Sequence, residues 1–141
     1  MSDEFRVEFD GGSRGNPGPA GCGAVVRDGD GQELITYGRY VGRATNNVAE
    51  YHGLIAGLTK ALELNARRVH VFGDSELIVR QMQGQYKVKN AGLKPLYDRA
   101  RALADSFESI RFTHVSREQN KLADRLSNLA IDRKGEVHDV E

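Results

Sequence analysis

Residues 5–21 read FRVEFDGGSRGNPGPAG, and this stretch decides the fold. Between Phe5 and Phe9 apolar and charged residues alternate, which is the period-2 pattern of a strand with one buried face. The strand delivers Asp10 to its C-terminal end. The glycine- and proline-rich residues 11–19 that follow predict a loop with unusual backbone freedom.

Two more strands are predicted directly after this loop. They cover Gly21–Arg27 and Glu33–Val41, and the residues that join them, Asp28–Gly31, read DGDG. Asp-Gly pairs between apolar runs are a strong hairpin signal. The chain therefore begins as an antiparallel meander of three strands.

The apolar pattern then changes to steps of three and four, which predicts a helix over Asn47–Leu64, capped at its start by Thr45, Asn46 or Asn47. The later elements are a strand at 69–72, a helix beginning at 77–82, a helix at 95–107, a strand at 110–114, a helix at 120–131 and a frayed tail at 134–141. The order is βββαβααβα, and we expect residues 1–141 to form a single domain.

The composition excludes several classes of protein. The single cysteine, Cys22, rules out an internal disulfide and a cysteine-based zinc site. The acidic N-terminus is unlike a signal peptide, and no apolar run approaches the ~20 residues of a membrane span. These features predict a cytoplasmic protein with no membrane partner. The charges balance at 20 Lys+Arg against 20 Asp+Glu, yet residues 34–49 and 77–97 contain bases and no acid, so a nucleic-acid partner stays possible.

Four carboxylates occupy informative places: Asp10, Glu50, Asp74 and Asp124. Each has an ordinary explanation, because Glu50 completes a capping box, Asp74 can cap a helix and Asp124 suits a helix dipole. Two of them, however, follow strands, where open α/β sheets place their sites. Several carboxylates without cysteine suit Mg²⁺ or Mn²⁺, and a pair of such ions suits phosphodiester hydrolysis.

The acids lie in strings that resemble the type 1 ribonuclease H family. These strings are FDGGSRGNPGPAG at 9–21, TNNVAE at 45–50, GDS at 73–75, and His114 followed ten residues later by Asp124. The resemblance implies an α/β fold with a mixed five-stranded sheet, three strands antiparallel and two parallel, flanked by helices. It also implies hydrolysis of the RNA strand of an RNA/DNA hybrid, leaving 5′-phosphate and 3′-hydroxyl ends.

The resemblance further implies roles for individual residues. Asp10, Glu50, Asp74 and Asp124 would hold two Mg²⁺ ions, or Mn²⁺ as a substitute, with Asp10 bridging them. His114 matches a mobile histidine that assists proton movement or product release, although a lone strand-end histidine is often structural. The expected nucleic-acid contacts are Asn16, Asn46, Asn47 and Gln119 for the RNA strand and Arg43, Thr45 and Asn90 for a phosphate of the DNA strand.

Those contact residues have ordinary explanations too, since asparagines serve turns and caps and Arg43 alone is a solvated charge. His52 and His70 lack such a context and are interpreted as structural. Many relatives carry a basic, tryptophan-bearing helix that is missing here, because only residues 85–89 separate Gly84 from Asn90 and the chain has no tryptophan. The chain thus resembles bacterial or archaeal members without this protrusion, which weakens the expected grip on substrate.

Three hypotheses follow. The first is an active, metal-dependent endoribonuclease, expected to be a monomer without an obligatory protein partner. The second is a catalytically silent nucleic-acid-binding module on the same fold, which should have lost an acid, whereas all four are present. The third is a generic α/β ligand-binding domain, which leaves the placement of the acids to coincidence.

Overall fold

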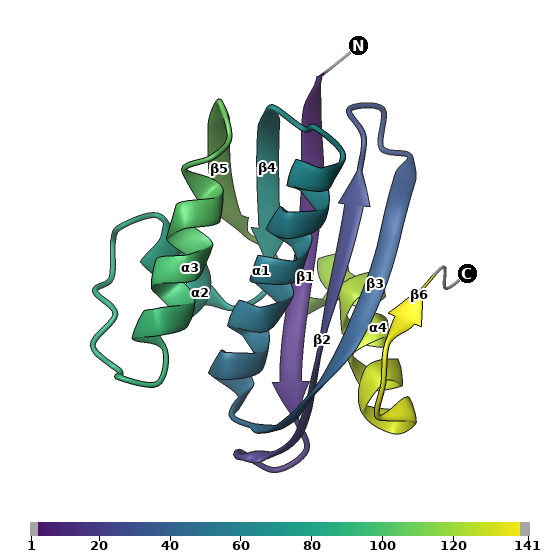
Figure 1. Ribbon diagram of the computed structural model, residues 1–141, viewed down its shortest axis with the longest axis vertical. Coiled ribbons are helices and arrows are strands. Elements are labelled where there is room, and N and C mark those ends of the chain that lie inside the picture. The colour runs from purple at the N-terminus through teal and green to yellow at the C-terminus, as the bar shows by residue number, and fades with distance from the viewer. Residues whose placement is uncertain (1–2, 139–141) are drawn as a thin grey trace.

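The computed structural model describes residues 3–138 (Figure 1). Its strands are β1 (Glu4–Ser13), β2 (Gly18–Arg27), β3 (Glu33–Ala44), β4 (Arg68–Gly73), β5 (Ser109–His114) and β6 (Val137–His138). Its helices are α1 (Asn46–Glu63), α2 (Glu76–Met82), α3 (Lys94–Ala104), the short 3₁₀ helix η1 (Arg117–Asn120) and α4 (Lys121–Arg133). None of the helices in this part of the chain has the length and apolarity to cross a membrane.

The strands form one mixed sheet in the order β5-β4-β1-β2-β3-β6. Strands β1, β2 and β3 are the antiparallel meander that the sequence predicts, while β4 pairs with β1 in parallel and β5 pairs with β4 in parallel. The α/β fold class and the predicted order βββαβααβα are therefore confirmed, with the short helix η1 added before α4. Parallel strands need a crossover, and α1 supplies it between β3 and β4.

The sheet has a sixth strand where the sequence predicts a frayed tail. Val137 and His138 pair with Gly38 and Tyr37 of β3. Val137 is buried against α4, and the hydroxyl of Tyr37 donates to Glu136 at 2.8 Å. The burial of Val137 and the hydrogen bonds to β3 thus hold a segment that is too polar and short to be predicted as a strand. Residues 139–141 of the predicted tail lie outside the described residues.

The loop predicted at 11–19 is also shorter, because β1 and β2 stay paired as far as Ser13 and Ala20. Gly11 is predicted to lie in the loop, but glycine is needed there because α1 presses on the sheet. A Cβ atom on Gly11 would lie 2.3 Å from the carbonyl oxygen of Ala49 in α1. Here glycine marks close packing rather than a turn.

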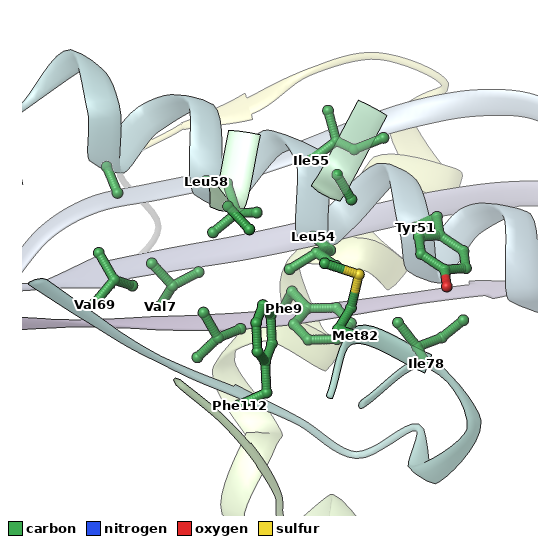
Figure 2. Close-up of a cluster of buried hydrophobic side chains, with 14 of the residues drawn as sticks. Val7, Phe9, Tyr51, Leu54, Ile55, Leu58, Val69, Ile78, Met82 and Phe112 are labelled. Carbon is green, nitrogen blue, oxygen red and sulfur yellow. The ribbon is translucent and has the colours of Figure 1, made fainter. Parts of the chain in front are cut away.

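Helices α1, α2 and α3 cover one face of the sheet, and α4 packs behind the other (Figure 1). Figure 2 shows the larger of the two cores, where Leu54 and Leu58 of α1 face Val7 and Phe9 of β1. Met82 of α2 closes this core from the side. The burial of these apolar side chains is the main driving force that brings α1 onto β1.

The approach of α1 to β1 gives a first test, the substitution Gly53→Ala. Alanine favours a helix interior over glycine by about 1 kcal/mol. A Cβ atom at this position, however, would lie 2.3 Å from the carbonyl oxygen of Asp10. We expect the substitution to lower the free energy of unfolding by about 2 kcal/mol, measured by urea denaturation.

The matched control is Gly12→Ala, because a Cβ atom there meets nothing closer than 3.8 Å. This control should change the urea midpoint little. A Gly53→Ala variant as stable as the parent would show that α1 does not depend on this close approach.

Candidate metal centre and nucleic-acid interface

Two aspartates lie side by side at the carboxyl end of the parallel strands. β1 pairs with β4 as far as Phe9 and Gly73, whereas its ladder with β2 continues to Ser13. Asp10 therefore follows the last parallel pair but lies inside β1, not at its end as the sequence predicts. Asp74 directly follows Gly73. Both side chains thus lie at the sheet edge where α/β folds bind ligands.

Glu50 reaches the same edge from α1 because this helix packs closely on β1. A Cβ atom on Gly11 would lie 2.2 Å from the carbonyl carbon of Ala49, so glycine is required there. The N–H of Gly11 donates to Glu50 Oε1 at 2.6 Å. The cap of α1 is Thr45, whose hydroxyl oxygen accepts from the N–H of Val48 at 3.3 Å. Glu50 is therefore not part of the helix cap, and its ordinary explanation is wrong.

Asp10, Glu50 and Asp74 form one acidic cluster. One carboxylate oxygen of each lies within 4.8 Å of the others. The side chains of Asp10 and Glu50 are buried, so their carboxyl groups are withdrawn from water. Asp124, in the first turn of α4, lines the same cavity of about 520 Å³. The structure thus brings together all four acids that the sequence singles out.

The electrostatics of the cluster are strongly perturbed. Burial raises the pKa of Asp10 from 3.8 to about 7, and the charge of Asp74 adds to this rise. Burial and the neighbouring Asp10 carboxyl raise the pKa of Glu50 well above its usual range. Burial and the charge of Asp124 raise the pKa of Asp74. Without a cation, these carboxyl groups cannot all ionise at neutral pH, and Asp10 and Glu50 retain a proton between them.

The donor set fits a hard divalent cation. Glu50 Oε2 is buried, and no hydrogen-bond donor in residues 3–138 reaches it. A buried carboxylate oxygen without a donor is costly unless a cation contacts it. Carboxylate oxygens alone, with no thiolate among them, match the preference of Mg²⁺ and Mn²⁺. The residues therefore fit the ions that the sequence predicts.

Two residues of the site escape the sequence analysis. Asn120 is fully buried, and its side-chain amide donates to the carbonyl oxygen of Phe9 at 2.8 Å, which ties the start of α4 to the strand just before Asp10. Arg117 lines the acidic cavity, and its charge opposes the rise in the pKa of Asp74. In a sequence, a polar residue before a helix is interpreted as a helix cap, and an arginine in a loop is interpreted as a solvated charge. No signal in a single sequence separates these cases.

His114 lies at the rim of the acidic cluster. It pairs in register with Gly73, and its Nε2 lies 3.3 Å from the carbonyl oxygen of Asp74. The side chain is exposed. The other three histidines have different contacts, since His52 lies against Arg39, His70 against Thr113 and His138 against the ring of Tyr37. Of the four, His114 is the one placed beside the cluster.

The predicted amide contacts surround two adjoining cavities. Asn46 and Asn47 line the acidic cavity, while Asn16, Thr45 and Asn90 line a second cavity of about 280 Å³ that also includes Asn47. Asn47 therefore joins the two. The side-chain oxygens of two of these residues already accept hydrogen bonds from the backbone. Asn46 Oδ1 accepts from the N–H of Ser13, and Asn16 Oδ1 accepts from the N–H of Asn46.

Arg43 and Gln119 are not brought to these cavities. Arg43 is exposed and lies outside the lining of both, although Thr45 and Asn90 meet as the sequence predicts. Gln119 lies in η1, where its side-chain oxygen accepts from the N–H of Ser116 in a capping box. It faces a different cavity, beside Glu8 and Arg27. Contacts of either residue with nucleic acid stay predictions.

Comparison with known proteins places this geometry in context. A protein-family profile described as "Reverse transcriptase-like" matches residues 8–130. The bifunctional protein Rv2228c of Mycobacterium tuberculosis is 53% identical over 127 residues, which cover 89% of this chain and 35% of that protein. Ribonuclease HI of Halobacterium salinarum is 44% identical over 124 residues, which cover 88% of this chain and 62% of that enzyme. The chain thus spans about a third of the first relative.

Solved structures agree in fold and in sequence. The N-terminal RNase H domain of Rv2228c, solved as a fusion with maltose-binding protein, superposes with a TM-score of 0.91 at 52% identity, covering 94% of this chain and 96% of that one. LC11-RNase H1, isolated from compost by a metagenomic approach and solved with an RNA/DNA hybrid, gives a TM-score of 0.87 at 43% identity. That match covers 93% of this chain and 99% of the other.

The buried Asp10 carboxyl predicts a pH-dependent stability of the metal-free protein. Its pKa in the folded state is about 7 and its ordinary value is 3.8, so folding favours the protonated form. This contribution is fully present below about pH 4 and is lost as the pH rises through 7. Asp10→Asn removes the penalty, and we expect it to raise the Tm at pH 8 by about 5 °C in a chelator-containing buffer.

The difference between Asp10→Asn and the parent should shrink towards pH 4. The control is Asp30→Asn, an exposed acid in the turn between β2 and β3, which should not change the Tm profile. Parallel Tm profiles for Asp10→Asn and the parent from pH 4 to pH 8 would contradict the assignment of a raised pKa to Asp10.

Proposed function

This chain belongs to the type 1 ribonuclease H family, and on that premise we propose that it is a metal-dependent endoribonuclease that hydrolyses the RNA strand of RNA/DNA hybrids. One observation carries the proposal. Four carboxylates from β1, α1, the end of β4 and α4 converge on a single cavity, and three of them offer oxygens within 4.8 Å of one another. A fold alone does not specify an activity, but this convergence supplies a hydrolytic site.

Asp10, Glu50, Asp74 and Asp124 would hold the metal ions. When bound, two divalent cations supply Lewis-acid chemistry, which lowers the pKa of an attacking water and stabilises the departing 3′ oxygen. The carboxyl group of Asp10 interacts with those of Glu50, Asp74 and Asp124, so it would take the central part in holding the ions. Cleavage in this geometry leaves a 5′-phosphate and a 3′-hydroxyl.

His114 would move a proton at the edge of this site. Its exposed imidazole next to Asp74 can approach the scissile region without displacing a buried group. An imidazole can both donate and accept a proton, which suits transfer of a proton to a leaving oxygen or the release of product. Its contact with a backbone carbonyl at 3.3 Å is loose enough for the ring to reorient.

Substrate selection would come from the two adjoining cavities. Asn46 and Asn47 border the acids, where amide groups can pair with the 2′-hydroxyl of the RNA strand as donor or acceptor. Thr45 and Asn90 share the second cavity, which is suited to a phosphate of the DNA strand. Because Asn47 borders both cavities, the two strands of a hybrid would be read by one continuous surface.

The decisive experiment compares four labelled duplexes with and without Mg²⁺: an RNA/DNA hybrid, double-stranded RNA, double-stranded DNA and a DNA duplex with one embedded ribonucleotide. The proposal predicts cleavage of the hybrid's RNA strand in Mg²⁺ and none after removal of the metal with chelator. Hybrid binding without cleavage under any metal condition would instead favour the catalytically silent module.

Asp74→Asn tests the acid cluster, because it removes one charge at nearly constant volume. We expect the rate of hybrid cleavage to fall by at least about a hundredfold, with an unchanged circular dichroism spectrum. The exposed Asp30→Asn should cleave at the parental rate. Full activity in Asp74→Asn would refute the assignment of the site.

His114→Ala tests the proton-transfer role. We expect kcat to fall by about tenfold or more with little change in the Kd for hybrid, because the imidazole acts in turnover and not in binding. The control is His70→Ala, whose side chain contacts Thr113 away from the acids. Identical pH–rate profiles for His114→Ala and the parent would remove His114 from the reaction.

A further inference from the structure

A second charged cavity lies away from the acids, between β3 and α1. Tyr37 and Arg39 enter it from β3, His52 and Lys60 from α1, and Arg99 from α3, and its volume is about 200 Å³. We call it the β3–α1 cavity. His52 and Lys60 lie two and ten residues after Glu50 on the same helix, so the cavity spans from about 3 Å to about 15 Å from Glu50 along the helix axis. It is not used by the proposed hydrolysis.

The cavity is rich in cations and has no carboxylate in its lining. Arg39 and Arg99 make no ion pair within 4.0 Å in residues 3–138. Most arginines of this part of the chain do have such a partner, namely Arg6, Arg14, Arg27, Arg67, Arg68, Arg80, Arg101 and Arg111. Charges left unpaired in a concave surface favour an anionic ligand.

Two of the cations are oriented by neighbouring side chains of the cavity. Arg39 Nη2 lies 3.1 Å from His52 Nδ1, and a guanidinium can only donate, so the imidazole is the acceptor. Lys60 Nζ lies 4.9 Å from the centre of the Tyr37 ring, in cation–π geometry. The Tyr37 hydroxyl is directed to Glu136, which is not part of the lining. Arg39 is therefore oriented by a partner without negative charge, whereas Lys60 also lies 3.8 Å from Glu63 Oε1, which is outside the lining.

We propose that the β3–α1 cavity binds a phosphate group, with the guanidinium groups of Arg39 and Arg99 as donors and Lys60 as a point charge. Guanidinium forks match the oxygens of phosphate in pairs, and ammonium groups bind it electrostatically. The volume admits one such group with its water. The phosphate comes either from solution, as the free ion, or from the backbone of a polynucleotide that extends beyond the active site.

The first arm of the test is an NMR titration with inorganic phosphate against sodium chloride at constant ionic strength. The backbone amides of Arg39 and Lys60 should shift saturably with phosphate and not with chloride. Arg99→Gln should weaken the apparent affinity at least about tenfold. Arg99 is exposed on α3, so this variant should fold, and Arg133→Gln, on the exposed end of α4, is the matched control.

The second arm measures the Kd of metal-free protein for hybrids of about 8 and about 20 base pairs, since the far end of the cavity, about 15 Å from Glu50, lies about 4 base-pair steps away. If Arg99→Gln binds the longer hybrid several-fold more weakly than the parent but binds the shorter one equally well, the proposal is supported and the phosphate belongs to the polynucleotide backbone. If inorganic phosphate binds saturably while the affinities for both hybrids are unchanged, the proposal is supported and the ligand is the free phosphate ion. If Arg99→Gln matches the parent in both arms, the proposal is overturned. Cleavage of the short hybrid by Arg99→Gln should be unchanged, so failure here is separable from failure of the proposed hydrolysis.

Discussion

The contact between the carboxyl groups of Asp10 and Glu50 is the interaction around which this structure is arranged. Two buried acids side by side are unfavourable, and both pKa values are raised by burial. The contact exists because apolar packing drives α1 onto β1, and because glycines at positions 11 and 53 leave room for backbone against backbone. The stability of the core thus offsets the cost of a preorganised acidic site.

The mixed topology of the sheet explains how the other acids are positioned at the same cavity. β1 leaves its parallel partner after Phe9 but continues antiparallel to β2, so Asp10 lies on a rigid strand next to the free edge at Asp74. On the other face, the amide of Asn120 anchors α4 to the same strand and brings Asp124 into the cavity. Each acid is therefore carried by a different element, and each element is fixed by β1.

Much of this arrangement follows from the sequence. The period-2 and period-3.6 patterns predict the meander and α1, and the flanking strings identify the four acids. The predictions that the structure contradicts are wrong for physical reasons. Gly11 is predicted to lie in a loop because its close packing against α1 is invisible in a sequence, and Val137 is predicted to lie in the tail because its burial depends on α4. The partner of Glu50 lies 39 residues away at Gly11, so a local capping box was the wrong interpretation.

The central claim is that Asp10, Glu50 and Asp74 are built to share divalent cations, and the most direct measurement is anomalous scattering from crystals soaked in Mn²⁺. The account predicts a strong anomalous peak in contact with carboxylate oxygens of Asp10 and Glu50, including the buried Glu50 Oε2 that lacks a donor. The absence of an anomalous peak at this cluster in crystals soaked in saturating Mn²⁺ would contradict the claim that these acids share divalent cations.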